Sequence, residues 1–197
     1  RRHKMTDEEL QGLIQTAIAN KPKGLEQVKE LVSLAHKYSV ALASHDDDTE
    51  AKVELSAKRG VAIAEFPANI ELAAKSRDYG ASVLMGAPNL IRGGSHVGWM
   101  SVEAAAKANV VDCLCSDYHY PSLFHAPFKL AEMGIMEFDR AWKLVSAHPA
   151  KAAGIGNSKG SIASGWDADF LLVNPDDGYT SALDSVYIRG EAIANYR

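Results

Sequence analysis

Cysteine is scarce in this sequence, with Cys113 and Cys115 as its two thiols. They form a C-x-C pattern on an apolar stretch that reads as a strand, so both side chains would point the same way and a disulfide between them would be strained. No second cysteine pair is present, which excludes a zinc site built from cysteines alone. We expect two buried, reduced thiols in a cytoplasmic protein, with a soft-metal pair as the open alternative.

The chain also lacks an excess of basic charge, a long apolar run and a recognisable secretory signal. Its 21 Lys and Arg stand against 25 Asp and Glu, a net charge of -4, and no basic stripe is present, so nucleic acid is not expected as a partner. The apolar runs are far shorter than a membrane span, and a charged start leads into a polar helix rather than a signal peptide. The 47% hydrophobic content suits one packed domain, or one large and one small.

The N-terminal part shows apolar residues at helical spacing. Residues 6–20 are predicted to form a helix, because Thr6 and Glu9 match a capping box. Pro22 stands near the start of a second helix that continues at helical spacing to Ala35. The sequence therefore predicts two helices before the first strand.

Short apolar segments then alternate with helical ones. Each apolar segment is apolar on both faces and preceded by a helix, which is typical of parallel strands in an α/β fold. Four strands are predicted, over residues 39–44, 61–64, 82–85 and 110–115. The helices between and after them are predicted over residues 48–59, 69–79, 101–108, 123–133 and 137–147.

Beyond residue 155 the pattern changes to short strands separated by turns. Residues 169–174 and 185–191 read as strands, with the turn-rich stretch 175–178 between them. This pattern predicts antiparallel β structure. We therefore expect an α/β part over residues 1–155 and a small β-sandwich module over residues 156–197.

Chemically versatile residues follow each predicted strand directly. His45 ends the first strand, Glu65 ends the second, a glycine-rich loop over residues 86–96 follows the third, and Asp117 follows the fourth. In a β/α barrel the active site is built from residues at these strand ends. The sequence therefore predicts that these residues line one site.

Each of the three titratable residues has a functional and a structural interpretation. His45 is either a metal ligand oriented by a neighbouring carboxylate or a strand-end residue beside a helix start, and Asp48 is expected to cap that helix in both cases. Asp117 is interpreted as a metal ligand and proton acceptor, with an Asx turn as the alternative. Glu65 is either a ligand or base, or a carboxylate paired with an arginine.

The loop over residues 86–96 has the composition of an anion-binding loop. Arg92 supplies a planar, bidentate donor, and the two adjacent glycines can present backbone N–H groups. We predict that Asn89, Arg92, Ser95 and His96 bind phosphate groups of a substrate. The alternative is a surface loop with scattered polar groups.

Several of these motifs together resemble a known family. His45 and Asp117 each follow a predicted strand, and the chain continues with HPAKAA at 148–153 and GSIASGWDADFLLV at 160–173. This order resembles the C-terminal half of the amidohydrolase superfamily. Three further segments are similar to the branch of that superfamily that acts in phosphonate catabolism, namely SHDD at 44–47, AEFP at 64–67 and GAPNLIRGGSH at 86–96. The resemblance covers nearly the whole chain.

This resemblance implies the C-terminal half of a TIM-type (β/α)8 barrel and a metal-dependent hydrolase. The implied reaction is release of pyrophosphate from α-D-ribose 1-methylphosphonate 5-triphosphate, with zinc as the expected divalent metal and manganese or iron as alternatives. By position, His45 matches a metal ligand after the fifth barrel strand. Asp117 matches the aspartate after the eighth strand, which binds metal and moves a proton. Glu65 stands where the superfamily has a second histidine, and it is a candidate third ligand.

The superfamily's remaining metal ligands have no counterpart here. No His-x-His motif occurs, and four strands do not close an eight-stranded barrel, so we expect this chain alone to bind metal poorly and to have little activity. An open barrel edge would pair with another chain, which predicts a homo-oligomer or a complex with other phosphonate-pathway proteins. The competing predictions are another amidohydrolase reaction, such as cyclic amide hydrolysis or deamination, and a non-catalytic scaffold.

Overall fold

The structure, a computed structural model, describes residues 5–94, 98–174 and 182–196. The chain divides into two compact units, Arg1–Val40 and Ala41–Arg197. Within the described residues, no helix combines the length and the apolar character that a membrane crossing requires.

The first unit contains one long helix, α1 (Asp7–Lys37). The capping box is confirmed, since Thr6 Oγ1 accepts from the Glu9 N–H and the Glu9 carboxylate accepts from the Thr6 N–H. The prediction of two helices was wrong, because Pro22 lies inside the helix. A proline removes one backbone hydrogen bond from a helix interior, and the helix continues through it although Asn20 and Gly24 nearby are also poor helix formers. A lone helix cannot bury its own apolar stripe, and Leu13 and Ile18 are more than half exposed.

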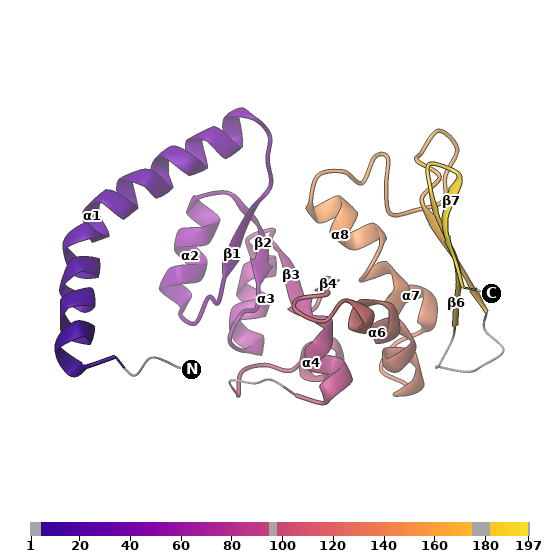
Figure 1. Ribbon diagram of the computed structural model, residues 1–197, viewed down its shortest axis with the longest axis horizontal. Coiled ribbons are helices and arrows are strands. Elements are labelled where there is room, and N and C mark those ends of the chain that lie inside the picture. Colours follow the sequence, from indigo (N-terminus) through magenta and orange to yellow (C-terminus); the bar gives the residue numbers. More distant parts are fainter. Residues whose placement is uncertain (1–4, 95–97, 175–181, 197) are drawn as a thin grey trace. The chain divides into compact units, whose positions relative to one another are not determined.

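The second unit is built on a four-stranded parallel sheet, in which the strands are hydrogen-bonded in chain order (Figure 1). They are β1 (Leu42–His45), β2 (Val61–Glu65), β3 (Ser82–Gly86) and β4 (Cys113–Cys115). The register pairs His45 with Glu65 and Gly86 with Cys115. We call the side where these residues and the following loops lie the carboxyl end of the sheet, and the opposite side the amino end. The predicted strands and their parallel arrangement are confirmed.

Burial within this sheet is uneven. The apolar core gathers around β3 and β4, where Val83, Met85 and Leu114 are almost completely buried. In β1 no residue is buried. Because β1 and β4 are the outer strands, each pairs with a neighbour on one side within the described part of the chain.

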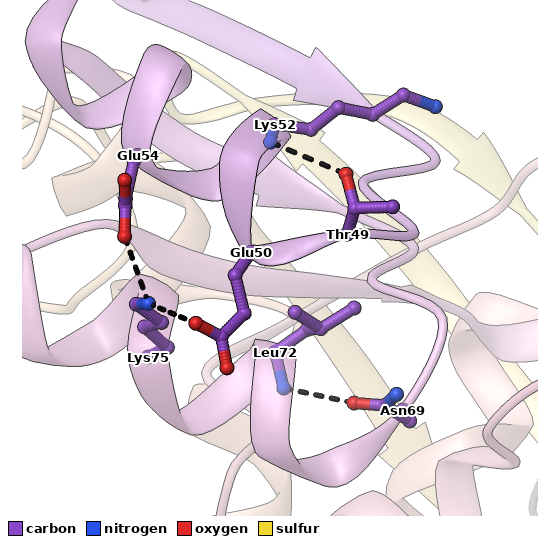
Figure 2. A network of polar contacts seen from close by, with 7 residues as sticks. All are labelled: Thr49, Glu50, Lys52, Glu54, Asn69, Leu72 and Lys75. Carbon is purple, nitrogen blue, oxygen red and sulfur yellow. Dashed lines mark hydrogen bonds and ion pairs between the residues drawn. The ribbon is translucent and has the colours of Figure 1, made fainter.

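Helices α2 (Glu50–Lys58) and α3 (Ile70–Asp78) follow β1 and β2. Figure 2 shows their caps, in which Thr49 Oγ1 accepts from the Lys52 N–H and Asn69 Oδ1 accepts from the Leu72 N–H. The expectation that Asp48 caps α2 was wrong. Thr49 has the extended backbone of an N-cap, and Asp48 instead forms an ion pair with Lys52 at 2.8 Å.

An ion-pair network joins these two helices. Lys75 of α3 reaches Glu50 at 2.8 Å and Glu54 at 3.0 Å, both in α2 (Figure 2). The two carboxylates raise the pKa of Lys75 through hydrogen bonds and charge. The network therefore joins α2 to α3 through side chains of both helices.

The glycine-rich segment after β3 is more regular than a loop. Residues Ala87–Arg92 form the short helix α4, with Pro88 in its first turn and Gly93 as a left-handed C-cap (φ 87°). The helix α5 (Val102–Lys107) follows. The segment that the sequence predicted to be an open loop therefore begins with a short helix.

Three more helices precede the C-terminal part, α6 (Tyr120–Glu132), α7 (Phe138–Lys143) and α8 (Ala147–Ala152). Aromatic side chains join α6 to α7, with Phe128 and Trp142 ring centroids 5.7 Å apart and Phe128 and Phe138 centroids 4.9 Å apart. The sequence predicted α6 and α7, although it extended α7 into the residues that form α8.

The C-terminal strands form a separate antiparallel sheet in the order β5 (Phe170–Asn174), β6 (Ala182–Ile188) and β7 (Glu191–Asn195). The sequence predicted β5 and β6 but not β7. The strand predicted over residues 185–191 continued through Arg189 and Gly190, where the chain turns with positive φ. The described part of this module is one three-stranded sheet. The fold class, α/β with a small β module, is confirmed, and the boundary at residue 155 stays a prediction.

Candidate functional site

The carboxyl end of the parallel sheet encloses a cavity of about 320 Å³. All four strand ends contribute to it, so the topology brings these segments together. The end of β2 contributes through Phe66 and Pro67, and Glu65, which was predicted to line the site, is not among the lining residues. The lining residues are His45, Asp46, Phe66, Pro67, Met85, Gly86, Pro88, Asn89, Arg92, Trp99, Met100, Asp117 and Tyr118.

His45 lies among acidic groups at the ends of β1 and β2. Its Nδ1 is 3.3 Å from Asp46 Oδ2, and its Nε2 is 3.9 Å from Glu65 Oε2. The ring also meets Phe66 edge-on, with centroids 5.3 Å apart. The imidazole is thus oriented through one nitrogen by a carboxylate, while the other nitrogen faces a second carboxylate.

The chain turns sharply at three of the four strand ends. Asp46, Phe66 and Asp117 have positive φ values of 58°, 55° and 46°. The Asp46 N–H still donates to Glu65 O and the Phe66 N–H to Leu84 O, so the left-handed turns begin where the sheet hydrogen bonds end. Non-glycine residues held in this region often cluster at functional sites.

Asp117 lies over the end of the third strand. A methyl group placed on Gly86 would lie 3.5 Å from Asp117 Oδ2 and 3.5 Å from the Phe66 ring. These are ordinary van der Waals distances, so the Asp117 carboxylate and the Phe66 ring both lie close to Gly86. Residues that follow β2 and β4 therefore lie beside the end of β3.

Arg92 is held at the rim of the cavity by two acceptors. It donates through Nη1 to the Tyr118 hydroxyl, and through Nη2 to Gly94 O at 3.1 Å. Tyr118 follows Asp117, so this bond links helix α4 to the end of β4. Tyr118 was not among the predicted site residues, although its position directly after Asp117 was the signal that could have found it.

Asn89 has a structural contact in addition to its place on the cavity wall. Its Oδ1 accepts from the Val102 N–H at 2.9 Å, which ties α4 to the start of α5. Its predicted role in substrate binding stays a prediction. Ser95 and His96, the other two predicted phosphate ligands, lie outside the described residues.

Sequence reasoning missed the apolar wall of the cavity. Phe66, Met85 and Trp99 line it from three different segments. The sequence signal for Trp99 was its place directly after the glycine-rich segment, while Met85 was read as an ordinary strand residue. The cavity therefore offers a polar side for charged groups and an apolar side for carbon atoms.

The donors around the cavity fit part of a divalent-metal site. Imidazole nitrogen and carboxylate oxygen suit zinc, manganese and iron, and His45 and Glu65 are close enough to face one ion. Among the described residues, however, no group of three or more His, Cys, Asp or Glu side chains is arranged to hold a metal. A catalytic zinc site takes three protein ligands, so these residues supply a partial set.

The two cysteines differ along β4. Cys113 is almost fully buried, and burial raises the pKa of its thiol to about 12. Cys115, at the carboxyl end, is partly exposed, and burial also raises its pKa. Both thiols are free, as the sequence predicted, but the prediction that both are buried was wrong for Cys115.

Comparison with known sequences gives one long match. The chain is 36% identical over 195 residues to α-D-ribose 1-methylphosphonate 5-triphosphate diphosphatase from Escherichia coli (strain K12). The match covers 98% of this chain and 51% of that enzyme, so the chain spans about half the length of this relative.

Solved structures match the fold at lower identity. An amidohydrolase from Thermotoga maritima MSB8 superposes with a TM-score of 0.65 at 20% identity, over 97% of this chain and 57% of that one. An ochratoxinase from A. niger gives a TM-score of 0.63 at 18% identity, over 87% of this chain and 45% of that one. Together with the parallel sheet in chain order, these structures place the chain as half of a TIM-type barrel.

The family model named "Amidohydrolase family" matches residues 8–193, which include the parallel sheet, β5, β6 and every strand end that lines the cavity. On this match, the chain belongs to the amidohydrolase family.

Proposed function

We propose that this chain carries one half of the active site of a metal-dependent hydrolase of phosphonate catabolism. The proposed reaction is the one named for the Escherichia coli relative, release of pyrophosphate from α-D-ribose 1-methylphosphonate 5-triphosphate. One observation carries the proposal: the guanidinium of Arg92 is fixed by Tyr118 at the rim of a cavity that also holds His45 and Asp117.

The arginine suits a polyphosphate because of how it is held. A planar guanidinium binds two phosphate oxygens at once, and contacts to Tyr118 and Gly94 fix the plane before substrate arrives. Such preorganised positive charge stabilises the negative charge that develops when a phosphoanhydride breaks. We assign Arg92 to the phosphate chain of the substrate.

The apolar wall suits the rest of such a substrate. A cavity of about 320 Å³ lies at the small end of the range for ligand sites, which are largely apolar with a few placed polar groups. Phe66 and Trp99 are aromatic residues of the cavity wall, and we assign them to packing against the ribose ring. Cationic and apolar sides together favour a phosphorylated sugar over a small cyclic amide.

The acidic residues serve proton transfer and metal binding. His45 and Glu65 would contribute part of the ligand set of a divalent ion, which would supply Lewis acidity and a more acidic bound water. Asp117 accepts a proton from the attacking water in this proposal. Asp46 holds the His45 ring in place through Nδ1 and leaves Nε2 directed toward Glu65.

A chimera tests this proposal. In the Escherichia coli relative, the segment that this chain matches is replaced by this chain, and pyrophosphate release is followed with zinc or manganese. We expect activity on the triphosphate, and we expect Arg92→Ala to lower kcat/KM by about 10²-fold or more. Arg59→Ala is the matched control, since Arg59 ends helix α2 and does not line the cavity.

Three results would contradict the proposal. Hydrolysis of a cyclic amide or deamination of a nucleoside without action on the triphosphate would favour another amidohydrolase reaction. A folded chimera with no bound metal and no activity would favour a scaffold. Equal kcat/KM for Arg92→Ala and the unmodified chimera would remove Arg92 from the site.

A further inference from the structure

Ser44, the residue before His45 in β1, has a buried hydroxyl oxygen without a hydrogen-bond partner among the described residues. A buried hydroxyl that gives up its water contacts and gains no replacement destabilises a fold. Such an atom is rare in native proteins and calls for a physical explanation.

A small cavity borders this hydroxyl on the side away from the proposed active site. With a volume of about 10 Å³, it has room for a water molecule. Its polar wall consists of Ser44, Asp47, Ser56 and Ser76, and its remaining wall is largely apolar. Sufficient room and a polar wall are the two conditions for an ordered water.

The other polar groups of the wall have hydrogen-bonding capacity for such a molecule. The Asp47 residue is 5% exposed, and its Oδ2 accepts from Ser56 Oγ at 3.2 Å. An ionised carboxylate can accept about four hydrogen bonds. The Ser76 hydroxyl donates to Leu72 O at 2.9 Å, so its oxygen can still accept.

We propose that one ordered water molecule occupies this cavity and joins the Ser44 hydroxyl to the Asp47 carboxylate. The water donates to the carboxylate and pairs with the Ser44 hydroxyl, which satisfies both buried groups. It links strand β1 to helix α2, because Ser56 of α2 holds the same carboxylate.

The position of this water gives it a role in shaping the carboxyl end of the sheet. Asp47 O accepts from the Ala68 N–H at 3.1 Å, and Ala68 O accepts from the Met100 N–H at 3.0 Å. The loops after β1, β2 and β3 are therefore hydrogen-bonded in series, starting from Asp47. The water anchors the first member of this series, and this inference does not depend on the proposed reaction.

A crystal structure of the 197-residue chain at a resolution that shows ordered solvent tests the proposal directly. The expected result is one water within hydrogen-bonding distance of both Ser44 Oγ and the Asp47 carboxylate. An empty cavity, or a Ser44 hydroxyl turned directly onto Asp47, would overturn it.

Thermal unfolding gives a second test, because a filled and a dry cavity predict different changes in Tm. If the water is present, Ser44→Ala breaks a buried hydrogen bond and lowers Tm by about 2–4 °C. If the cavity is dry, the same change removes an unsatisfied hydroxyl, and Tm stays equal or rises.

A double-mutant cycle with Asp47→Ala completes the design. A shared water makes the combined loss in Tm smaller than the sum of the two single losses. Additive losses would mean that Ser44 and Asp47 do not share a bridging molecule, and would overturn the proposal.

Discussion

The amino and carboxyl ends of the parallel sheet both carry charged and polar side chains, but these side chains are arranged differently. At the amino end, Asp112 Oδ2 accepts from the Val83 N–H at 2.9 Å and meets Arg77 Nε at 3.2 Å. Arg77 and Arg140 also donate to Asn109, and His148 Nδ1 lies 3.0 Å from Asp112 O. Charges there are matched by partners that connect α3, α7 and α8 to the strand starts.

At the carboxyl end the acidic groups lie beside one another and beside a histidine. Asp46 and Glu65 both lie within 4 Å of His45, and Asp117 faces the same cavity. Three residues there also hold positive φ values. Positive φ values occur at both ends, since Ser39 and Asn109 at the amino end also have them. The two ends differ in their side chains: the Asp112 carboxylate is paired with an arginine and a backbone N–H, whereas Asp46 and Glu65 lie beside a histidine at the end where barrel enzymes carry their active sites.

The largest expected effect is at the amino end. Asp112→Asn removes the charge that pairs with Arg77 and turns one oxygen into a donor, so it should lower the free energy of unfolding by about 1–2 kcal/mol. Urea unfolding of the chain measures this. Asp78→Ala, at the exposed end of the helix that carries Arg77, should change it by less than about 0.5 kcal/mol. Equal effects of the two variants would mean that the amino-end network adds no stability.

The two thiols of β4 allow the two ends of the sheet to be compared within a single strand. Cys115 at the carboxyl end should react with iodoacetamide at least about tenfold faster than Cys113, which is buried and whose pKa is raised to about 12. Mass spectrometry of peptides from a time course at pH 8 gives both rates, and Cys113→Ser confirms the assignment. Similar rates at both positions would show that the amino end opens as readily as the carboxyl end.

The smallest expected effect is the same aspartate substitution at the opposite end. Asp117→Asn keeps the shape of the side chain, and asparagine tolerates the left-handed backbone well. The free energy of unfolding should therefore stay within about 0.5 kcal/mol of the unmodified chain. A loss as large as that of Asp112→Asn would mean that Asp117 stabilises the fold, and the two ends would not differ.

The sequence predicted the carboxyl end better than the amino end for a physical reason. The strands that precede His45, Glu65 and Asp117 are short, apolar and parallel, and parallel strands bring their ends together whatever the side chains do. The amino-end network depends on long-range contacts such as Arg140 with Asn109. No spacing pattern in the sequence predicts those contacts.

Other features escaped prediction because tertiary structure overrode local signals. Pro22 reads as a helix start, yet it lies inside α1. Residues 86–92 read as a loop because of Gly86 and Pro88, whereas proline in the first turn favours the helix α4. The Arg92–Tyr118 bond joins residues 26 apart in the chain, and this distance hid a central contact of the site.

The proposed phosphate-binding site at the carboxyl end of this sheet can be tested by amide chemical-shift mapping of the ¹⁵N-labelled chain titrated with inorganic tripolyphosphate. We expect saturable shifts at Gly86, Arg92 and Tyr118, with none at Arg77 or Asp112. Shifts centred on the amino end, or none in the whole chain, would contradict it.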